Sequence, residues 1–245
     1  MNQQQAVLQT IEQLGGAATL GQLYVEVFKM KGCEWKTKTP TASIRRIVQL
    51  NKNIFRIKPG LYGLISKKSE LESRGMIAET DDNKDSLEVK NSTHTYYQAL
   101  LLIIGKLRNF DCWSPNQDKN KIFVDKKISS LRSLQEIPSF AHKDLVRRSA
   151  TVDVIWFNER KMPNSLFEVE HSTDMKNSLL KFTDLQDIHS RMVIVSSNTR
   201  KKELRDKLQF SAFRDIAKRV DFLPCEQLVK DYEVEMATSQ SGFRL

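Results

Sequence analysis

From residue 93 onward the sequence alternates helical and strand-like segments, and this alternation restricts the fold more than any other feature. Apolar residues dominate a helical segment at about Tyr96–Phe110, which indicates a helix buried against a sheet. Short runs of β-branched and aromatic residues predict strands at Thr151–Phe157, Ser165–His171, Arg191–Ser196 and Val220–Pro224. Interleaved elements of this kind predict a mixed α/β layer.

Acidic residues interrupt two of these predicted strands. Side chains alternate between the faces of a strand, so Glu168 and Glu170 share one face while Phe167 and Val169 take the other. If the two strands pair, Asp153 lies beside Glu168. Carboxylates brought together away from water repel one another, and a hard cation such as Mg²⁺ relieves that repulsion. The pattern therefore predicts a metal site, although on spacing alone a Glu-x-Glu pair is more often an exposed polar face.

Residues 1–66 predict three helices followed by a hairpin. The first helix ends at Gly15-Gly16, and Thr19-x-x-Gln22 is a capping box that opens the second. Thr39-Pro40 supplies an N-cap and a first-position proline for the third helix. The turn Lys58-Pro59-Gly60 then joins two short strands. Three helices and a hairpin form a winged helix, whose third helix reads the major groove of DNA.

The net charge of +9 is distributed unevenly along the chain. Residues 1–66 carry nine basic and three acidic residues, whereas residues 67–92 carry five basic and seven acidic ones. A basic N-terminal unit favours a polyanionic partner, although charge alone fits a merely basic soluble protein equally well. The polar, aperiodic stretch 67–92 predicts a linker between a domain at 1–66 and a second at 93–245.

The N-terminal unit resembles the HARE-type winged-helix domains that are fused to restriction-like enzymes. The resemblance covers about residues 4–65 and is carried by the helix start Thr39–Ile47 and the wing Phe55–Tyr62. It implies DNA binding by residues of the third helix and the wing, namely Arg45, Arg46, Arg56 and Lys58, with Gln49 on the same exposed helix face. Two alternatives stay open, because some winged helices bind protein and the two helix arginines also fit a solvated face.

The second domain resembles the PD-(D/E)XK nuclease superfamily and, more narrowly, a restriction-endonuclease-like family. The resemblance spans about residues 95–200. The matching motifs are Trp113-x-Pro115-x-x-Asp118, the strand Val152–Trp156 with its Asp153, the block Phe167-Glu-Val-Glu-His-Ser-Thr173, Leu179-Leu180 and Asp184-Leu185. The implied fold class is α/β, an N-terminal winged helix-turn-helix followed by a PD-(D/E)XK restriction-endonuclease-like core. The order of elements suits such a core, with the carboxylates expected near the edge of the sheet.

The second resemblance also implies roles for the acidic residues. Asp153 and Glu168 would be the metal ligands, with help from the carbonyl of Val169, and the cofactor would be Mg²⁺. Glu170 stands where many members of the superfamily have a lysine. A glutamate cannot offset phosphate charge as a lysine does, so Glu170 either acts as the base that activates water or binds a second cation.

The segment Ser172–Gln186 predicts a helix beyond the carboxylates. Lys176 and Lys181 on this helix are candidates to neutralise DNA phosphate, and a charged outer face explains them as well. The tail 238–245 is predicted to fray.

These features together predict a magnesium-dependent endonuclease that hydrolyses phosphodiester bonds in double-stranded DNA, as a type II restriction endonuclease. Cutting both strands favours a homodimer, and a restriction enzyme implies a companion DNA methyltransferase or a dependence on base modification. Two other hypotheses stay open: a DNA-binding regulator whose nuclease-like core is inactive, and a repair or structure-specific nuclease.

Several other classes of protein lack their motifs in this sequence. There is no P-loop, no GxGxxG and no GxSxG, and Cys33, Cys112 and Cys225 lie far apart without zinc-ligand spacing. No apolar run approaches the ~20 residues of a membrane span, and no signal peptide is evident. We therefore expect a cytoplasmic protein that does not interact with membranes.

Overall fold

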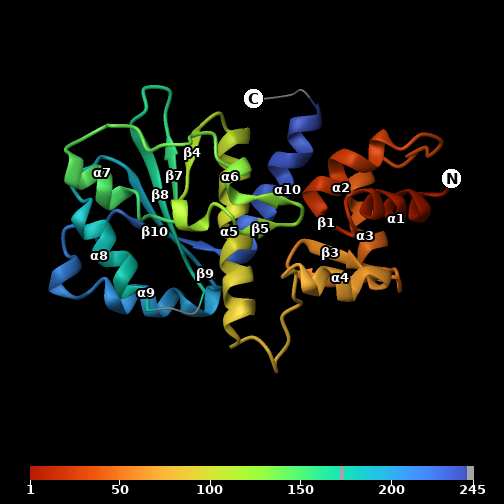
Figure 1. Cartoon of the computed structure of the whole chain (residues 1–245), viewed down its shortest axis with the longest axis horizontal. Helices are drawn as coiled ribbons and strands as arrows, with labels where there is room; N and C mark the ends of the chain where they lie inside the picture. Colours follow the sequence, from red (N-terminus) through yellow and green to blue (C-terminus); the bar gives the residue numbers. More distant parts are fainter. Residues whose placement is uncertain (172–173, 242–245) are drawn as a thin grey trace. The chain divides into compact units, whose positions relative to one another are not determined.

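The computed structural model describes residues 1–171 and 174–241. The chain forms two compact units, which Figure 1 colours along the sequence. The N-terminal unit comprises Met1–Ser92 together with the chain from Val229 onward, and the central unit comprises Thr93–Leu228. Residues beyond 228, which the sequence placed with the second domain, are therefore part of the N-terminal unit.

The N-terminal unit contains the three helices and the hairpin that the sequence predicted, together with a further short strand. In chain order its elements are α1 (Gln3–Gln13), β1 (Ala17–Thr19), α2 (Leu20–Glu26), the 3-10 turn η1 (Val27–Lys29), α3 (Pro40–Leu50), β2 (Ile54–Lys58), β3 (Leu61–Leu64), the 3-10 turn η2 (Ile65–Lys67) and α4 (Lys68–Ser73). The three strands form an antiparallel sheet in the order β1-β3-β2. Because β1 has only three residues, its sequence is too short to show the alternation of a strand.

The helix starts of the N-terminal unit follow the sequence in part. The Thr19 hydroxyl accepts a hydrogen bond from the backbone N–H of Gln22, and the Gln22 side-chain oxygen accepts one from the backbone N–H of Thr19. The predicted capping box is therefore confirmed. Pro40 is the first residue of α3 as expected. Thr39 occupies the N-cap position as predicted, but its side chain makes no capping hydrogen bond. Ile44 of α3 is fully buried and belongs to the core of this unit.

The end of α10 (Cys225–Ser241) packs in the core of the N-terminal unit. Tyr232 is 1% exposed, and its hydroxyl lies 2.8 Å from Oγ1 of Thr19. A Cβ added to Gly21 would lie 2.6 Å from Cε1 of Tyr232, so the glycine makes room for this ring. The predicted fraying of 238–245 is wrong for the described residues up to Ser241, which are helical, and residues 242–245 lie outside the description.

The segment 67–92, expected to be a linker, contains α4 and the first residues of α5 (Leu87–Leu107). Leu71 of α4 is fully buried, and its Cδ1 lies within 2.8 Å of where a Cβ on Gly63 would be. Met76, just after the helix, is also buried. One or two apolar anchors are enough to hold such a short helix, and they are too few to produce a periodic signal in the sequence.

The central unit is a mixed α/β layer, as the sequence predicted. Between α5 and α10 its elements are β4 (Asp111–Trp113), η3 (Asn116–Asp118), β5 (Ile122–Phe123), β6 (Lys126–Lys127), α6 (Ile128–Leu131), α7 (Lys143–Ser149), β7 (Val154–Phe157), β8 (Pro163–Glu170), α8 (Lys176–Asp184), β9 (Arg191–Ser196), η4 (Asn198–Arg200), α9 (Lys201–Lys207), η5 (Ser211–Phe213) and β10 (Val220–Pro224). Five strands form one sheet in the order β10-β9-β8-β7-β4. The first three are parallel to one another, and β7 and β4 are each antiparallel to their neighbours.

Helices cover both faces of this sheet, with α5 on one side and α7, α8 and α9 on the other (Figure 1). On the α8 side, Leu166 and Ile194 of the sheet share a core with Leu179 and Phe182 of α8. On the α5 side, the indole N–H of Trp156 donates to the carbonyl of Leu101 at 3.0 Å. The apolar helix predicted from Tyr96 onward is therefore buried against the sheet.

The acidic strand β8 is the central strand of the five, so the expectation that the carboxylates lie near the sheet edge is wrong. Its burial on both faces by helices explains the position, since a strand covered on both sides belongs inside a sheet. The helix expected at Ser172–Gln186 begins at Lys176, and Ser172 and Thr173 lie outside the described residues. In the described part of the chain, no helix has the length and apolar character needed to cross a membrane.

Candidate active site

The two acidic segments meet through the antiparallel pairing of β7 and β8. Val154 is opposite Phe167, and continuing this register by one residue places Asp153 opposite Glu168. The Oδ2 atom of Asp153 also accepts the backbone N–H of Val169 at 2.8 Å. This hydrogen bond fixes the Asp153 carboxylate beside the strand that carries the two glutamates.

Glu168 and Glu170 lie on the face of the sheet that α8 covers. The Ser178 hydroxyl of α8 donates to Oε2 of Glu168 at 2.9 Å and also contacts Oε1 of Glu170. Glu168 is 2% exposed and Glu170 is 5% exposed. The alternative explanation, an exposed polar face, is therefore wrong for this pair.

A lysine from α8 completes the contacts of Glu168. Lys181 Nζ lies 2.9 Å from Oε1 and 2.8 Å from Oε2 of Glu168, and it also donates to the carbonyl of Thr151 at 2.9 Å. The Lys181 side chain is 22% exposed, so it reaches the buried Glu168 carboxylate from a position that is partly open to solvent. Lys176, the other lysine proposed for this helix, is exposed and does not take part in these contacts.

Two polar residues of α5 hold Asp153 from the opposite side of the sheet. His94 Nε2 lies 3.1 Å from Oδ2 of Asp153, and the Gln98 amide donates to the Asp153 carbonyl at 2.9 Å. The same Gln98 nitrogen donates to Oδ2 of Asp118 at 2.9 Å. No motif in the sequence marks His94 or Gln98 as functional. Their spacing of four residues within an apolar helix, which puts them on one helix face, was the available signal.

The two facing carboxyl groups have pKa values that are displaced in opposite directions. Burial alone would raise the pKa of Asp153, but His94, the charge of Lys181 and the Val169 N–H together hold it below its usual value. Burial and then the charge of Asp153 raise the pKa of Glu168 to about 8, against the opposing effects of Lys181 and Ser178. The site therefore holds one stable carboxylate beside a second that ionises only above neutral pH.

The donor set fits a hard divalent cation. In the described part of the chain, Oδ1 of Asp153 accepts no hydrogen bond, and a cation is the partner that would relieve the repulsion between Asp153 and Glu168. Among the described residues, no group of three or more His, Cys, Asp or Glu is placed to hold a metal ion by itself. Mg²⁺ needs only one or two carboxylates when water and substrate phosphate supply its other ligands.

The residues predicted to bind DNA in the N-terminal unit differ in their surroundings. Arg46 and Gln49 of α3 and Arg56 of β2 are exposed. Arg45 donates to the Tyr24 hydroxyl at 3.2 Å and pairs with Glu233 of α10, a carboxylate that is only 6% exposed. The Arg45 side chain is 47% exposed, so its guanidinium is partly engaged inside the protein.

Lys58 is not displayed to solvent as the wing prediction requires. It is 4% exposed, and burial, partly offset by the charge of Glu79, lowers its pKa to about 8. The pairing of β2 with β3 is irregular between Arg56 and Lys58. This irregularity gives Ile57 and Lys58 buried positions in succession, which strict strand alternation does not allow.

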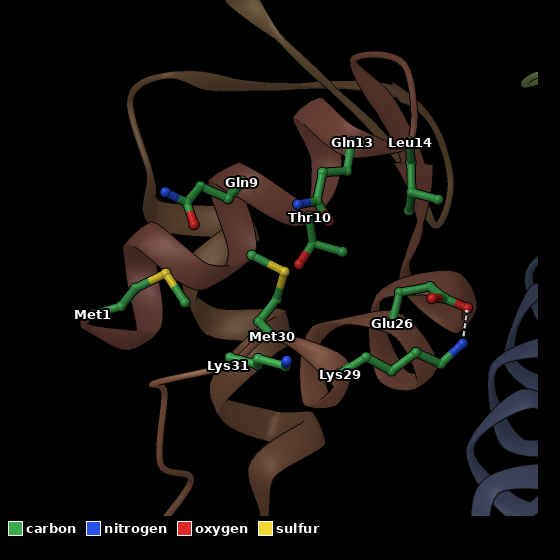
Figure 2. A pocket seen from close by; sticks show the side chains of 9 residues that line it. All are labelled: Met1, Gln9, Thr10, Gln13, Leu14, Glu26, Lys29, Met30 and Lys31. Atoms are coloured by element: carbon green, nitrogen blue, oxygen red, sulfur yellow. Dashed lines mark hydrogen bonds and ion pairs between the residues drawn. The ribbon is translucent and has the colours of Figure 1, made fainter.

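A hollow of about 420 Å³ in the N-terminal unit offers no comparable chemistry (Figure 2). It is lined by Met1, Gln9, Thr10, Gln13, Leu14, Glu26, Lys29, Met30 and Lys31. Its single carboxylate, Glu26, is paired with Lys29 at 2.7 Å. The Asp153–Glu168 pair therefore remains the strongest candidate for a reactive centre.

A fold with a buried carboxylate pair on a mixed sheet is accompanied by a clear family match. Residues 76–242 match the family described as the C-terminal domain of the type II restriction enzyme NmeDI, and the chain belongs to this family. The curated protein named type II restriction enzyme NmeDI, from Neisseria meningitidis serogroup C, is 30% identical over 138 residues. The aligned region covers 52% of this chain and 38% of that protein. No solved structure was found to match the chain.

Proposed function

We propose that the central unit is a PD-(D/E)XK-like, magnesium-dependent endonuclease that hydrolyses phosphodiester bonds in double-stranded DNA, as a type II restriction endonuclease. The observation that carries the proposal is the placement of Asp153, whose side chain is 14% exposed, opposite Glu168, which is buried beside Glu170. Membership of the restriction-enzyme family supports an activity of this kind.

The acidic residues divide into metal ligands and a base. Asp153 and Glu168, assisted by the carbonyl of Val169, would hold Mg²⁺. When bound, this ion would activate a water molecule and stabilise the charge that develops on the attacked phosphate. Glu170 shares Ser178 with Glu168 and accepts the proton of the attacking water.

Lys181 supplies the positive charge that a glutamate at position 170 cannot provide. Its ammonium lies against both oxygens of Glu168. A divalent ion would replace it there, and the ammonium would then be available to a phosphate oxygen of the DNA. Lys181 on α8 would thereby offset phosphate charge in place of a lysine at position 170 of the strand.

The N-terminal unit has the elements of a winged helix, and we assign it to DNA recognition. Exposed Arg46 and Gln49 on α3 and Arg56 on β2 are its proposed contacts. Arg45 contributes more weakly because Glu233 neutralises it. Lys58 is not among the proposed DNA contacts, because its side chain is buried. A homodimer would place two active sites across the duplex, and a DNA methyltransferase would be the companion enzyme of a restriction system.

Incubating the full chain with a panel of modified and unmodified genomic DNAs, with and without Mg²⁺, tests the proposal. We expect metal-dependent double-strand breaks whose sequenced ends share a common site, and no breaks with Asp153→Ala. Absence of metal-dependent cutting on every DNA would favour a regulator with an inactive core. Cutting that follows DNA shape or damage, without a common sequence, would favour a repair nuclease.

A further inference from the structure

A short basic hairpin, Lys119–Lys127, leads from η3 through β5 and β6 toward α6. Lys119, Lys126 and Lys127 are exposed, and in the described part of the chain none of them forms an ion pair. The fourth lysine of the hairpin, Lys121, pairs with Asp118 at 2.6 Å. Three cationic side chains on nine residues are thus left without an acidic partner from the protein.

The backbone of this hairpin is firmly anchored. Phe123 and Val124 are 4% and 2% exposed, and the Phe123 ring lies 5.9 Å from that of Tyr96 on α5. Val124 has a φ of 55°, a conformation that a β-branched residue adopts only where its surroundings enforce it. The backbone N–H of Ser129 also donates to the carbonyl of Lys119 at 3.1 Å. The lysines are therefore presented from a defined position.

The base of the hairpin is connected to the candidate active site. Asp118, 3% exposed, accepts from Lys121 on one oxygen and from Gln98 on the other. The same Gln98 nitrogen donates to the carbonyl of Asp153. Two hydrogen bonds from the Gln98 amide thus link Asp118, at the base of the hairpin, to Asp153 of the candidate active site.

We propose that this hairpin is a clamp for the DNA backbone, in which Lys119, Lys126 and Lys127 bind phosphates next to the one that is cleaved. The inference rests on the proposed action on DNA and adds a contact surface in the central unit. Phosphate is the partner that fits, because a row of exposed ammonium groups without a pocket positions a polyanion and does not read bases. Each such contact releases a counterion and makes binding salt-dependent.

Replacing all three lysines by glutamine tests the clamp in the full-length chain. Binding to a labelled DNA duplex would be measured by fluorescence anisotropy without metal, at a series of salt concentrations. We expect the slope of log affinity against log salt to become less steep by about 2–3, since each phosphate contact contributes about 0.9. At low salt the dissociation constant should rise about 10- to 100-fold, in line with the loss of two or three phosphate contacts.

The matched control is Lys201→Gln, Lys202→Gln and Arg205→Gln on α9, which removes the same charge from exposed helix positions. An unchanged salt slope in the hairpin variant, or an equal change in the control, would overturn the inference. If the unaltered chain binds DNA through the hairpin but cuts no DNA, the nuclease proposal fails and the clamp stands. If it cuts DNA and the hairpin variant binds as tightly, only the clamp fails. If it binds no DNA at all, both fail.

Discussion

At the scale of single residues, the charge of Glu168 depends on a small number of neighbouring side chains. Its carboxyl is buried and faces the stable carboxylate of Asp153, and among the described residues it touches one cation, Lys181. Because a dry environment amplifies electrostatic effects, removing that one ammonium changes the site more than removing an exposed lysine does. Two side chains of α8, Lys181 and Ser178, thus oppose the effects of burial and of Asp153 on the pKa of Glu168.

Lys181→Met is expected to lower the rate of magnesium-dependent DNA cleavage by about 10²- to 10³-fold, since it removes an electrostatic contribution from the transition state. Single-turnover cleavage at saturating DNA is the measurement. Lys181→Arg should retain part of the rate, and Lys218→Met, at an exposed position outside α8, is the control. Adding Glu170→Lys to Lys181→Met would show whether a lysine on the strand replaces the one on the helix. A Lys181→Met enzyme with the normal rate would contradict the role given to this residue.

The wild type is expected to gain stability relative to Lys58→Met as the pH rises above about 8, because burial, partly offset by the charge of Glu79, lowers the pKa of Lys58 in the folded protein. The pKa of Lys58 is about 8 in the folded protein and 10.5 for an ordinary lysine. Below about 8 both states hold the proton and the penalty is complete. As the pH rises from there toward 10.5 the folded state loses the proton first, so the wild type gains stability relative to the variant.

Urea unfolding near pH 7 and again above pH 9 measures this difference. Lys52→Met, at an exposed position, is the control and should have little effect at either pH. A stability difference between the wild type and Lys58→Met that does not change with pH would show that packing, and not charge, causes it.

Individual side chains of the site were predictable only where a regular pattern exposed them. The alternation of a strand put Glu168 and Glu170 on one face, and the pairing register then brought Asp153 opposite Glu168. The burial of Lys58 was not predictable, because the irregularity in β2 breaks that alternation. His94 and Gln98 were not selected because a polar pair in an apolar helix has no marker of its function until its partner is known.

At the scale of elements, α5 can approach the sheet closely because residue 105 is a glycine, which has no Cβ. A Cβ on Gly105 would lie 2.5 Å from both Sγ of Cys112 and Nε1 of Trp156. The Trp156 ring is held by its bond to Leu101 and by stacking on Phe110 at 5.3 Å, so it cannot move aside cheaply. The same helix carries His94 and Gln98, and its distance from the sheet therefore sets how they meet Asp153.

Gly105→Ala is expected to destabilise the central unit by about 1–3 kcal/mol through overpacking. Helix propensity alone would favour alanine by about 1 kcal/mol, so the sign of the measured change separates the two effects. Lys106→Ala, at the exposed neighbouring position, is the control and should change stability by less than about 0.5 kcal/mol. Chemical unfolding followed by tryptophan fluorescence measures both, and a stabilised Gly105→Ala protein would contradict the close approach.

Elements were predictable from the sequence in proportion to their length and regularity. The helices α1, α3 and α5 and the strands β7 to β10 have enough apolar residues at regular spacing to be recognised. The strands β1, β5 and β6 have two or three residues each, which is too few to show a period. Helix α4 is held by tertiary contacts of Leu71, which its polar sequence does not reveal.

At the scale of the whole molecule, one active site can cut one strand of a duplex. We therefore expect a homodimer in the cleaving state, with a sedimentation coefficient that increases with protein concentration or on addition of cognate DNA. Below the dimer dissociation constant, cleavage of supercoiled plasmid should accumulate nicked circles before linear DNA appears. A strictly monomeric protein that linearises plasmid in one step would contradict this expectation.

The hydroxyl contact of Tyr232 with Thr19 joins residues that are 213 positions apart in the sequence, and the Tyr232 ring also fills the space beside Gly21. A ribosome releases residues 1–92 long before it synthesises the tyrosine that fills their interior. Until then the nascent unit has a gap beside Gly21 and an Arg45 without its carboxylate partner. Proteolysis or chaperone binding of the nascent unit should therefore continue until α10 emerges, and a truncation before Tyr232 would damage the unit that residues 1–92 begin.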